Sequence, residues 1–157
     1  MNLNFLNIYN NLIKLTRNKN LFSKDLKSDS FSNRLVLFFI HFAFFIKIYK
    51  NQSNKKEIQN LYDFIFKQIE LSLREIGYGD TSINKKMKEY INYLYFIIDK
   101  AELWETTNLN SKLDFFAKYL DIDKESSFYV DYFDKYINFL LKNSFNHFTK
   151  DVISLKF

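Results

Sequence analysis

The sequence predicts an all-α fold, a single-domain bundle of about six or seven helices around a central apolar helix at about residues 31–49. Two observations lead to this class. The chain has no proline and only two glycines, whereas the many turns of a β-sandwich or barrel require such residues. Hydrophobic residues make up 47 % and aromatic residues 20 % of the 157 residues, which is enough for one core in one domain, residues 1–157.

The N-terminal part contains the first expected helix and the most apolar one. Residues 3–15 carry apolar side chains at helical spacing, and the connection at 16–33 is polar and irregular. Three apolar residues in this connection could dock a short helical turn: Leu21, Phe22 and Leu26. Residues 31–49 are apolar on nearly all sides, and such a helix must be covered from every direction. We therefore place it at the centre of the fold.

The next helix is amphipathic and is expected at residues 55–76. Ser53 or Asn54 is expected to cap its start, because a side-chain oxygen there can accept from the free N–H groups of the first turn. Gly77 is expected to end it, because glycine adopts the left-handed conformation without strain.

Three further helices are expected in the second half of the chain. Asp80 or Ser82 should cap a helix that runs to about residue 103 and packs antiparallel to its predecessor. Two more amphipathic stretches follow at about 110–120 and 125–148. An acidic connection separates these two stretches.

The longest apolar run, Leu35–Ile46, has 12 residues and contains His41, whereas crossing a bilayer takes about 20 apolar residues. We therefore predict a buried core helix and no transmembrane segment. The N-terminus lacks the charged region, apolar stretch and cleavage site of a signal peptide, and it is too poor in arginine for a transit peptide. We expect the protein to stay where it is made.

The most informative local feature is the corner that holds both glycines of the chain, Gly77 and Gly79, followed by Asp80. A helix–helix corner explains all three residues. Gly77 ends one helix, Gly79 lets the backbone turn or be approached closely, and Asp80 places a carboxylate near the positive end of the next helix. A functional surface can coexist with this structural role.

Three lysines, Lys85, Lys86 and Lys88, lie in the first two turns of the helix expected after this corner, where the helix dipole favours acidic groups. One interpretation is that they bind an anionic partner together with Arg74. The other is that they form a solvated face without function. The net charge of +5 leaves the same choice open, because nucleic acid, an anionic membrane and an acidic protein would each be attracted.

Motifs of catalysis and metal binding are missing from the sequence. There is no cysteine, no GxSxG, no glycine-rich phosphate loop and no HExxH. The only histidines, His41 and His147, do not form a metal-binding pair, and we expect His41 to be a core side chain that is hydrogen-bonded to one neighbour. We therefore expect no enzymatic activity, no metal ion and no cofactor.

Two blocks of the sequence resemble a known family. The segment SLREIGYGDTSINKKMK (Ser72–Lys88) is similar to the signature of the ubiquinol-cytochrome c chaperone family, SLRE-x-G-V-G-D followed by a basic stretch. Upstream, Asp29, Asn33-Arg34 and the apolar run with His41 resemble the family's D-T-x-x-G-R-F and the apolar helix after it. With Tyr9, Arg17 and Phe22, the resemblance covers about residues 9–100. The pair Phe96-Ile97 departs from it, because the family has Gly-Arg there.

The resemblance implies a non-catalytic chaperone that binds newly made cytochrome b, or its early intermediate, and supports assembly of respiratory complex III. It also implies a small partner protein or the ribosome as further partners, and no DNA. The implied location is cytoplasmic and peripheral at the inner membrane in a bacterium, or the matrix side of the mitochondrial inner membrane in a eukaryote. The expected partner-binding residues are Arg34, Arg74, Glu75, Tyr78, Asp80, Lys85, Lys86 and Lys88. The expected structural residues are Gly77, Gly79 and His41.

Two other functions fit parts of the sequence. The basic charge and the three lysines also suit a helical RNA- or ribosome-binding module, whose affinity would fall steeply with salt. A helical enzyme of unrecognised chemistry would need a carboxylate with a perturbed pKa in a deep pocket, and the sequence points to none.

Overall fold

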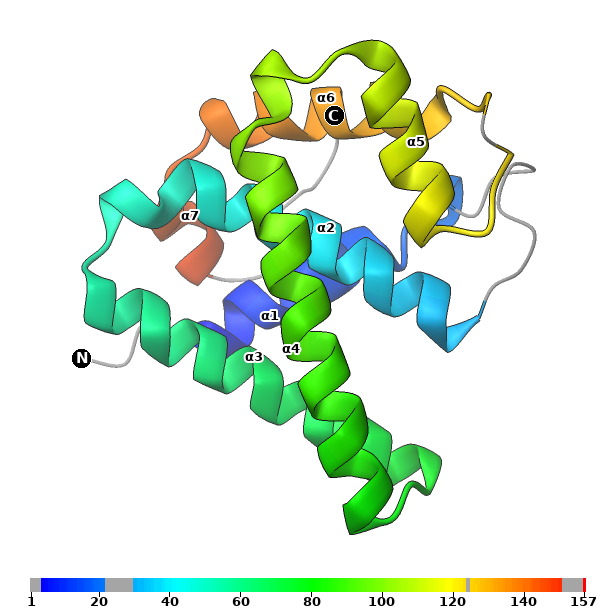
Figure 1. Cartoon of the computed structure of the whole chain (residues 1–157). Helices are drawn as coiled ribbons and strands as arrows, with labels where there is room; N and C mark the ends of the chain where they lie inside the picture. Colours follow the sequence, from blue (N-terminus) through cyan, green and yellow to red (C-terminus); the bar gives the residue numbers. More distant parts are fainter. Residues whose placement is uncertain (1–3, 22–29, 124, 151–156) are drawn as a thin grey trace.

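The computed structural model describes residues 4–21, 30–123, 125–150 and 157. Within these residues the chain forms seven α-helices and no strand, which confirms the all-α prediction (Figure 1). The helices are α1 (Phe5–Thr16), α2 (Phe31–Tyr49), α3 (Lys55–Ile76), α4 (Asp80–Glu102), α5 (Leu109–Tyr119), α6 (Phe128–Leu141) and α7 (Phe145–Thr149). Three residues with expected roles, Phe22, Leu26 and Asp29, lie outside the described ranges.

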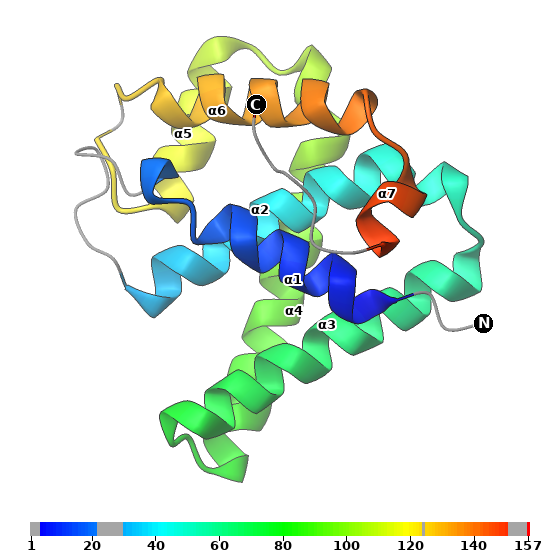
Figure 2. The same ribbon diagram turned by 180° about the vertical axis from the view of Figure 1, so that it is seen from behind.

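The central helix α2 is covered from several directions, as its composition predicts. Ser30 caps its start by accepting a hydrogen bond from the backbone N–H of Asn33 at 3.1 Å. From Leu35 to Ile46 every side chain is buried. Helices α1 and α4 lie against different sides of α2, and α6 covers another side (Figures 1 and 2).

The second half of the chain completes this core with aromatic rings. Phe133 of α6 lies between Phe44 of α2 and Phe116 of α5, with ring centroids 5.7 and 5.5 Å away. The rings of Phe116 and Phe133 are nearly parallel, at 12°. Because Phe116 and Phe133 are fully buried, α5 and α6 share one apolar core with α2.

Helices α3 and α4 form an arm that projects from this core. Asn54 caps α3 through a capping box, in which its side chain accepts from the N–H of Glu57 at 2.8 Å and the Glu57 carboxylate accepts from the N–H of Asn54. From their shared corner the two helices run in opposite directions and diverge, so that α4 reaches α2 while α3 reaches α1 (Figures 1 and 2).

The single helix predicted at 125–148 is wrong, because the chain breaks between α6 and α7. The hydroxyl of Tyr49 donates to the backbone carbonyl of Leu140 at 2.7 Å, which ties the end of α6 to the end of α2. The break turns Phe148 into the core, where its ring centroid lies 5.2 Å from that of Phe45. Burial of Phe148 therefore stabilises the broken arrangement more than a continuous helix would.

Residues Phe31–Gln52 form a helix with the length and mean hydropathy, 1.6, of a membrane-spanning segment. The length and composition of a helix alone do not distinguish a membrane span from a core helix. However, 72 % of its most apolar stretch is buried inside the protein, as expected of a core helix.

Candidate functional site

The corner between α3 and α4 requires glycine at one position. Gly77 has a φ angle of 109°, in the left-handed region that other residues rarely adopt. Its N–H donates to the carbonyl of Arg74 at 3.0 Å, and the N–H of Tyr78 donates to the carbonyl of Leu73 at 3.2 Å. These two bonds form a Schellman motif, which satisfies carbonyl groups at the end of α3.

The second glycine is not required by the fold. Gly79 has an ordinary φ angle of −79° and occupies the N-cap position of α4, so the predicted caps Asp80 and Ser82 are wrong. Among the described residues, no atom lies within 4 Å of the position that a Cβ atom at Gly79 would take. Of the two expected roles of Gly79, close approach is therefore not made by the described part of this chain.

Alanine substitutions at the two glycines should have different effects on stability. We expect Gly77→Ala to lower the free energy of unfolding by about 1–2 kcal/mol, because alanine is strained at this φ angle. Gly79→Ala should change it by less than about 0.5 kcal/mol, because two effects oppose each other. Alanine is a poorer N-cap residue than glycine, but it lowers the conformational entropy of the unfolded chain. Urea denaturation of the two variants measures both values. Equal losses would contradict the assigned backbone conformations.

Arg74 and Asp80 are engaged with each other across the corner. The guanidinium of Arg74 donates to Asp80 at 2.5 Å and to Glu70 at 3.1 Å. The hydrogen bond from Arg74, together with the charge of Lys67, lowers the pKa of the Glu70 carboxyl. This exposed network joins the last turn of α3 to the first residue of α4.

The three lysines do not act as one group. The ammonium group of Lys86 lies 4.8 Å above the ring of Tyr78, a cation–π contact within the corner. Lys85 and Lys88 are exposed and form no ion pair among the described residues. The lysines are the sixth, seventh and ninth residues of α4, beyond the first turn in which the helix dipole acts. The prediction that these lysines lie where the helix dipole favours acidic groups is therefore wrong.

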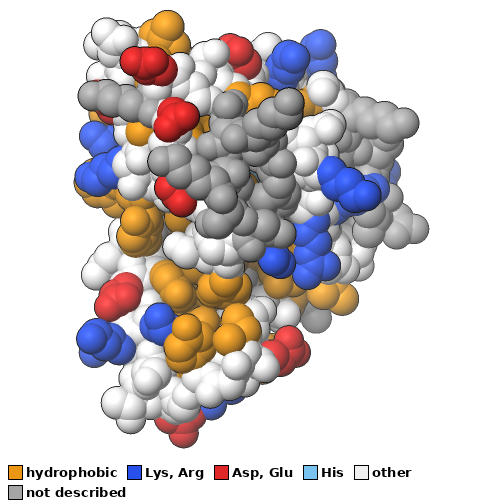
Figure 3. All heavy atoms as spheres, turned by 90° about the vertical axis from the view of Figure 1, so that its right-hand side faces the viewer, with side chains coloured by type: hydrophobic (Ala, Val, Ile, Leu, Met, Phe, Trp, Pro, Cys, Tyr) orange, Lys and Arg blue, Asp and Glu red, His pale blue; other side chains and the backbone are white. Residues whose placement is uncertain are grey.

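A groove of about 300 Å³ lies where α1, the start of α2 and the end of α3 meet. Its walls are mostly apolar and include Phe31, Leu35 and Ile76, of which Ile76 is 55 % exposed. Figure 3 looks onto the side of the molecule where α2 begins and the α3–α4 corner projects, and hydrophobic side chains gather there between basic and acidic ones.

Charged and polar groups are placed at defined points of the groove. Arg17 directly after α1, Arg34 of α2 and Glu75 of α3 line it and are all exposed. Burial raises the pKa of the Tyr9 hydroxyl, and a hydrogen bond with Ser72 opposes this shift. The groove thus combines apolar walls with charges of both signs.

The eight residues expected at the partner surface therefore fall into four places. Arg34 and Glu75 line the groove, whereas Arg74 and Asp80 form the ion pair of the corner. Tyr78 and Lys86 form the cation–π contact, and Lys85 and Lys88 lie further along α4. The groove itself was not predicted. The one local signal for it was Ile76, an apolar residue in the last position of an amphipathic helix.

His41 lies in the core and is fully buried. Its Nδ1–H donates to the carbonyl of Leu37 at 2.7 Å, so its Nε2 must accept from the hydroxyl of Tyr132 at 2.8 Å. Burial lowers the pKa of His41 to about 3, and the ring is therefore neutral. Both ring nitrogens are engaged within the protein. Across the described ranges, no three His, Asp or Glu side chains are grouped to hold a metal ion.

The chain was compared with protein families, curated proteins and solved structures, and one family matches it. No curated protein and no solved structure matches the chain. The model of the ubiquinol-cytochrome C chaperone family matches residues 27–103, about half of the chain. This segment contains α2, α3 and α4 with the glycine corner and two walls of the groove, whereas Tyr9 and Arg17 precede it. Over residues 27–103, the chain belongs to the ubiquinol-cytochrome C chaperone family.

Proposed function

We propose that this protein is a chaperone that binds newly made cytochrome b during the assembly of respiratory complex III, and that the groove between α1, α2 and α3 receives the client. The observation that carries this proposal is the groove itself, with its exposed apolar wall at Ile76 and its charged residues Arg34 and Glu75. Two of its three walls belong to the matched segment.

Family membership indicates a chaperone role in complex III assembly, with a protein such as a respiratory complex subunit as partner. It also implies a non-enzymatic role. The proposal adds the identity of the client and the surface that holds it. It further includes the location, cytoplasmic and peripheral at the inner membrane in a bacterium or on the matrix side in a mitochondrion.

The size and chemistry of the groove suit a short apolar segment of a protein. A volume of about 300 Å³ is at the lower end of the range of ligand pockets, so it accommodates a few side chains and not a whole helix. Cytochrome b is a membrane protein and carries exposed apolar side chains before it is inserted and assembled. Arg34 and Glu75 would orient the polar groups that flank such a segment.

The corner extends this surface. Glu75 and Ile76 are the last residues of α3 and directly precede Gly77, so the groove ends directly beside the corner. Gly79 leaves the backbone open to a partner that approaches closely, because no side chain is present and the fold itself makes no use of the space. Contact with a partner would thus explain why residue 79 is glycine although the fold does not require it.

Deletion of the gene tests the function. We expect the deletion strain to lose cytochrome b absorbance and ubiquinol oxidation, because unassembled cytochrome b would not be held in a form that continues to assembly. Reintroducing the gene should restore both. Unchanged complex III in the deletion strain would refute the proposed function.

A pair of variants on α3 tests the groove. Ile76→Lys places a charge on the apolar wall, whereas Leu71→Lys makes the same change outside the groove at a residue that is 41 % exposed. In the deletion strain, we expect Ile76→Lys to restore less than about half of the cytochrome b and Leu71→Lys to restore all of it, because only the first desolvates a charge on client binding. Full restoration by Ile76→Lys would show that the client binds elsewhere.

A further inference from the structure

Helix α4 has a side that faces away from the core and stays largely exposed within the described residues. Its buried stripe consists of Ile83, Leu94, Ile97 and Ala101. The opposite side includes Lys85, Lys88, Asn92, Phe96, Lys100 and, directly after the helix, Leu103, and all six are exposed. Positions 85, 92, 96 and 103 are separated by seven or four residues, close to whole turns of 3.6 residues, so they lie along one line. We call these six residues the outer face of α4.

Aromatic rings and lysines meet on this face where α5 comes beside it. The ammonium groups of Lys100 and Lys118 lie 5.4 and 4.9 Å from the centroid of the Phe96 ring. Tyr119 of α5 lies 6.0 Å from Phe96 and 5.1 Å from Tyr93. Phe96 remains 42 % and Tyr93 40 % exposed, so α5 does not cover these rings.

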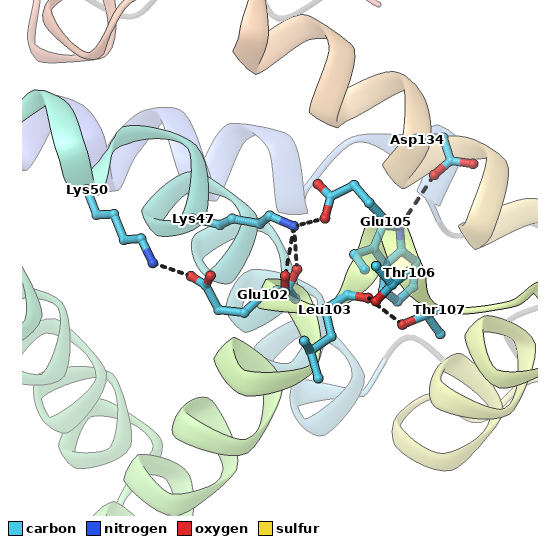
Figure 4. Close-up of polar contacts among 10 residues, drawn as sticks. Lys47, Lys50, Glu102, Leu103, Glu105, Thr106, Thr107 and Asp134 are labelled. Atoms are coloured by element: carbon cyan, nitrogen blue, oxygen red, sulfur yellow. Dashed lines mark hydrogen bonds and ion pairs between the residues drawn. The ribbon is translucent and has the colours of Figure 1, made fainter.

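Two acidic residues, Glu102 at the end of α4 and Glu105 just after it, form ion pairs with lysines at the end of α2. Lys47 donates to the carbonyl of Ala101 at 2.8 Å and pairs with the Glu105 carboxylate, and Lys50 pairs with Glu102 at 2.6 Å (Figure 4). The side chain of Leu103 points away from these contacts, and it is 63 % exposed.

The charge that remains on the outer face is positive. Lys85, Lys88 and Lys100, with Lys118 of α5, form no ion pair within the described ranges. Two carboxylates, Glu89 and Asp99, are exposed on the same side of α4. Four lysines thus stand against two acidic residues, beside exposed apolar groups.

We propose that the outer face of α4, together with Lys118, binds the surface of an anionic phospholipid bilayer. Lysine side chains lie along apolar surface while their ammonium groups reach outward, and aromatic rings favour the headgroup region of a bilayer. A helix with a basic and apolar outer face that lies flat on the membrane combines both interactions. The inference deepens the peripheral location proposed above, and its test needs no client.

The ring geometry favours a bilayer over single-stranded RNA. Base stacking needs an open ring face, whereas Phe96 has two lysine ammonium groups over its ring. Tyr93 and Tyr119 meet edge to face at 70°, so they do not form a row of parallel platforms. Lipid phosphates, in contrast, can contact the lysines without displacing them from the rings.

Flotation with lipid vesicles tests the proposal. We expect the whole protein to float with phosphatidylcholine vesicles that contain phosphatidylglycerol, and not with pure phosphatidylcholine. The double variant Lys100→Gln/Lys118→Gln should partition about tenfold more weakly, since each surface lysine contributes to binding near anionic lipid. The control is Lys135→Gln on α6 with Lys142→Gln directly after it. It has the same net charge and also changes two exposed lysines, so it should lose less than about threefold.

A third variant separates apolar insertion from charge. Phe96→Ala keeps every charge but removes the exposed ring, and it should weaken partition about threefold or more. Absence of vesicle binding by the wild-type protein, or equal losses in the two lysine double variants, would overturn the inference. Binding of a single-stranded RNA oligonucleotide in place of vesicles, lost in Lys100→Gln/Lys118→Gln, would reassign the face to nucleic acid. Since these measurements contain no cytochrome b, their failure leaves the gene-deletion test of the chaperone function intact.

Discussion

Replacement of Phe133 by alanine is expected to lower the free energy of unfolding by about 3–5 kcal/mol. The side chain is fully buried, and its ring contacts elements from both halves of the chain. Its centroid lies 4.8 Å from that of His41 and 5.5 Å from that of Phe116. Removing it leaves a cavity between α2, α5 and α6, and the loss is a large part of the roughly 5–15 kcal/mol that stabilises a typical domain.

Urea denaturation followed by circular dichroism measures this loss. Phe139→Ala on the same helix is the matched control, because Phe139 is only partly buried and should cost less than half as much. A single transition is expected in both variants, since α5 and α6 share the core of α2. A loss below about 1 kcal/mol in Phe133→Ala would show that the C-terminal helices fold separately from the segment that belongs to the family.

Stability should also fall in mild acid because of His41. The pKa of His41 is about 3 in the folded protein, below the ordinary value of 6.5 for the unfolded chain. Between these values the unfolded chain binds a proton that the folded protein cannot bind, so the stabilisation is complete above pH 6.5 and decreases as the pH falls. The slope is up to about 1.4 kcal/mol per pH unit, which amounts to about 2 kcal/mol between pH 6.5 and 4.5.

Comparison of two histidine variants isolates this effect. His41→Leu should be less stable at pH 7, because it leaves the partly buried Tyr132 hydroxyl without its acceptor and removes the side-chain donor to the Leu37 carbonyl. Its stability should depend less on pH in this window. His147 is exposed, so His147→Gln should retain the pH dependence of the wild type. An unchanged slope in His41→Leu would contradict the assignment of the acid sensitivity to this side chain.

The bounds of α2 and α3, and the approximate extent of α4, could be predicted from the sequence because local signals agree there. Asn54 and Glu57 form the capping box of α3, Gly77 ends it, and the apolar stripes follow one helical period. The break after α6 could not be predicted, because no glycine or proline marks it and it depends on contact with α2, which is distant in sequence. Tertiary contact decides such a boundary.

The candidate site could be predicted only in part for a similar reason. Arg34 and Glu75 line the groove, but the groove exists only because α1 approaches the end of α3. Lys85 and Lys88 are close to Glu75 in sequence, yet the corner reverses the chain between them and places them on another surface. Proximity in the sequence predicts residues of a shared surface within one helix but not across a turn.

The burial of α2 also determines how the protein must be made. Its aromatic and aliphatic side chains are covered partly by α6 and α7, whose synthesis ends about 90–100 residues after that of α2. Until then, a helix with the mean hydropathy of a membrane segment lacks part of its cover. During its own synthesis, this protein therefore passes through a stage in which it exposes the same kind of surface that it is proposed to shield in its client.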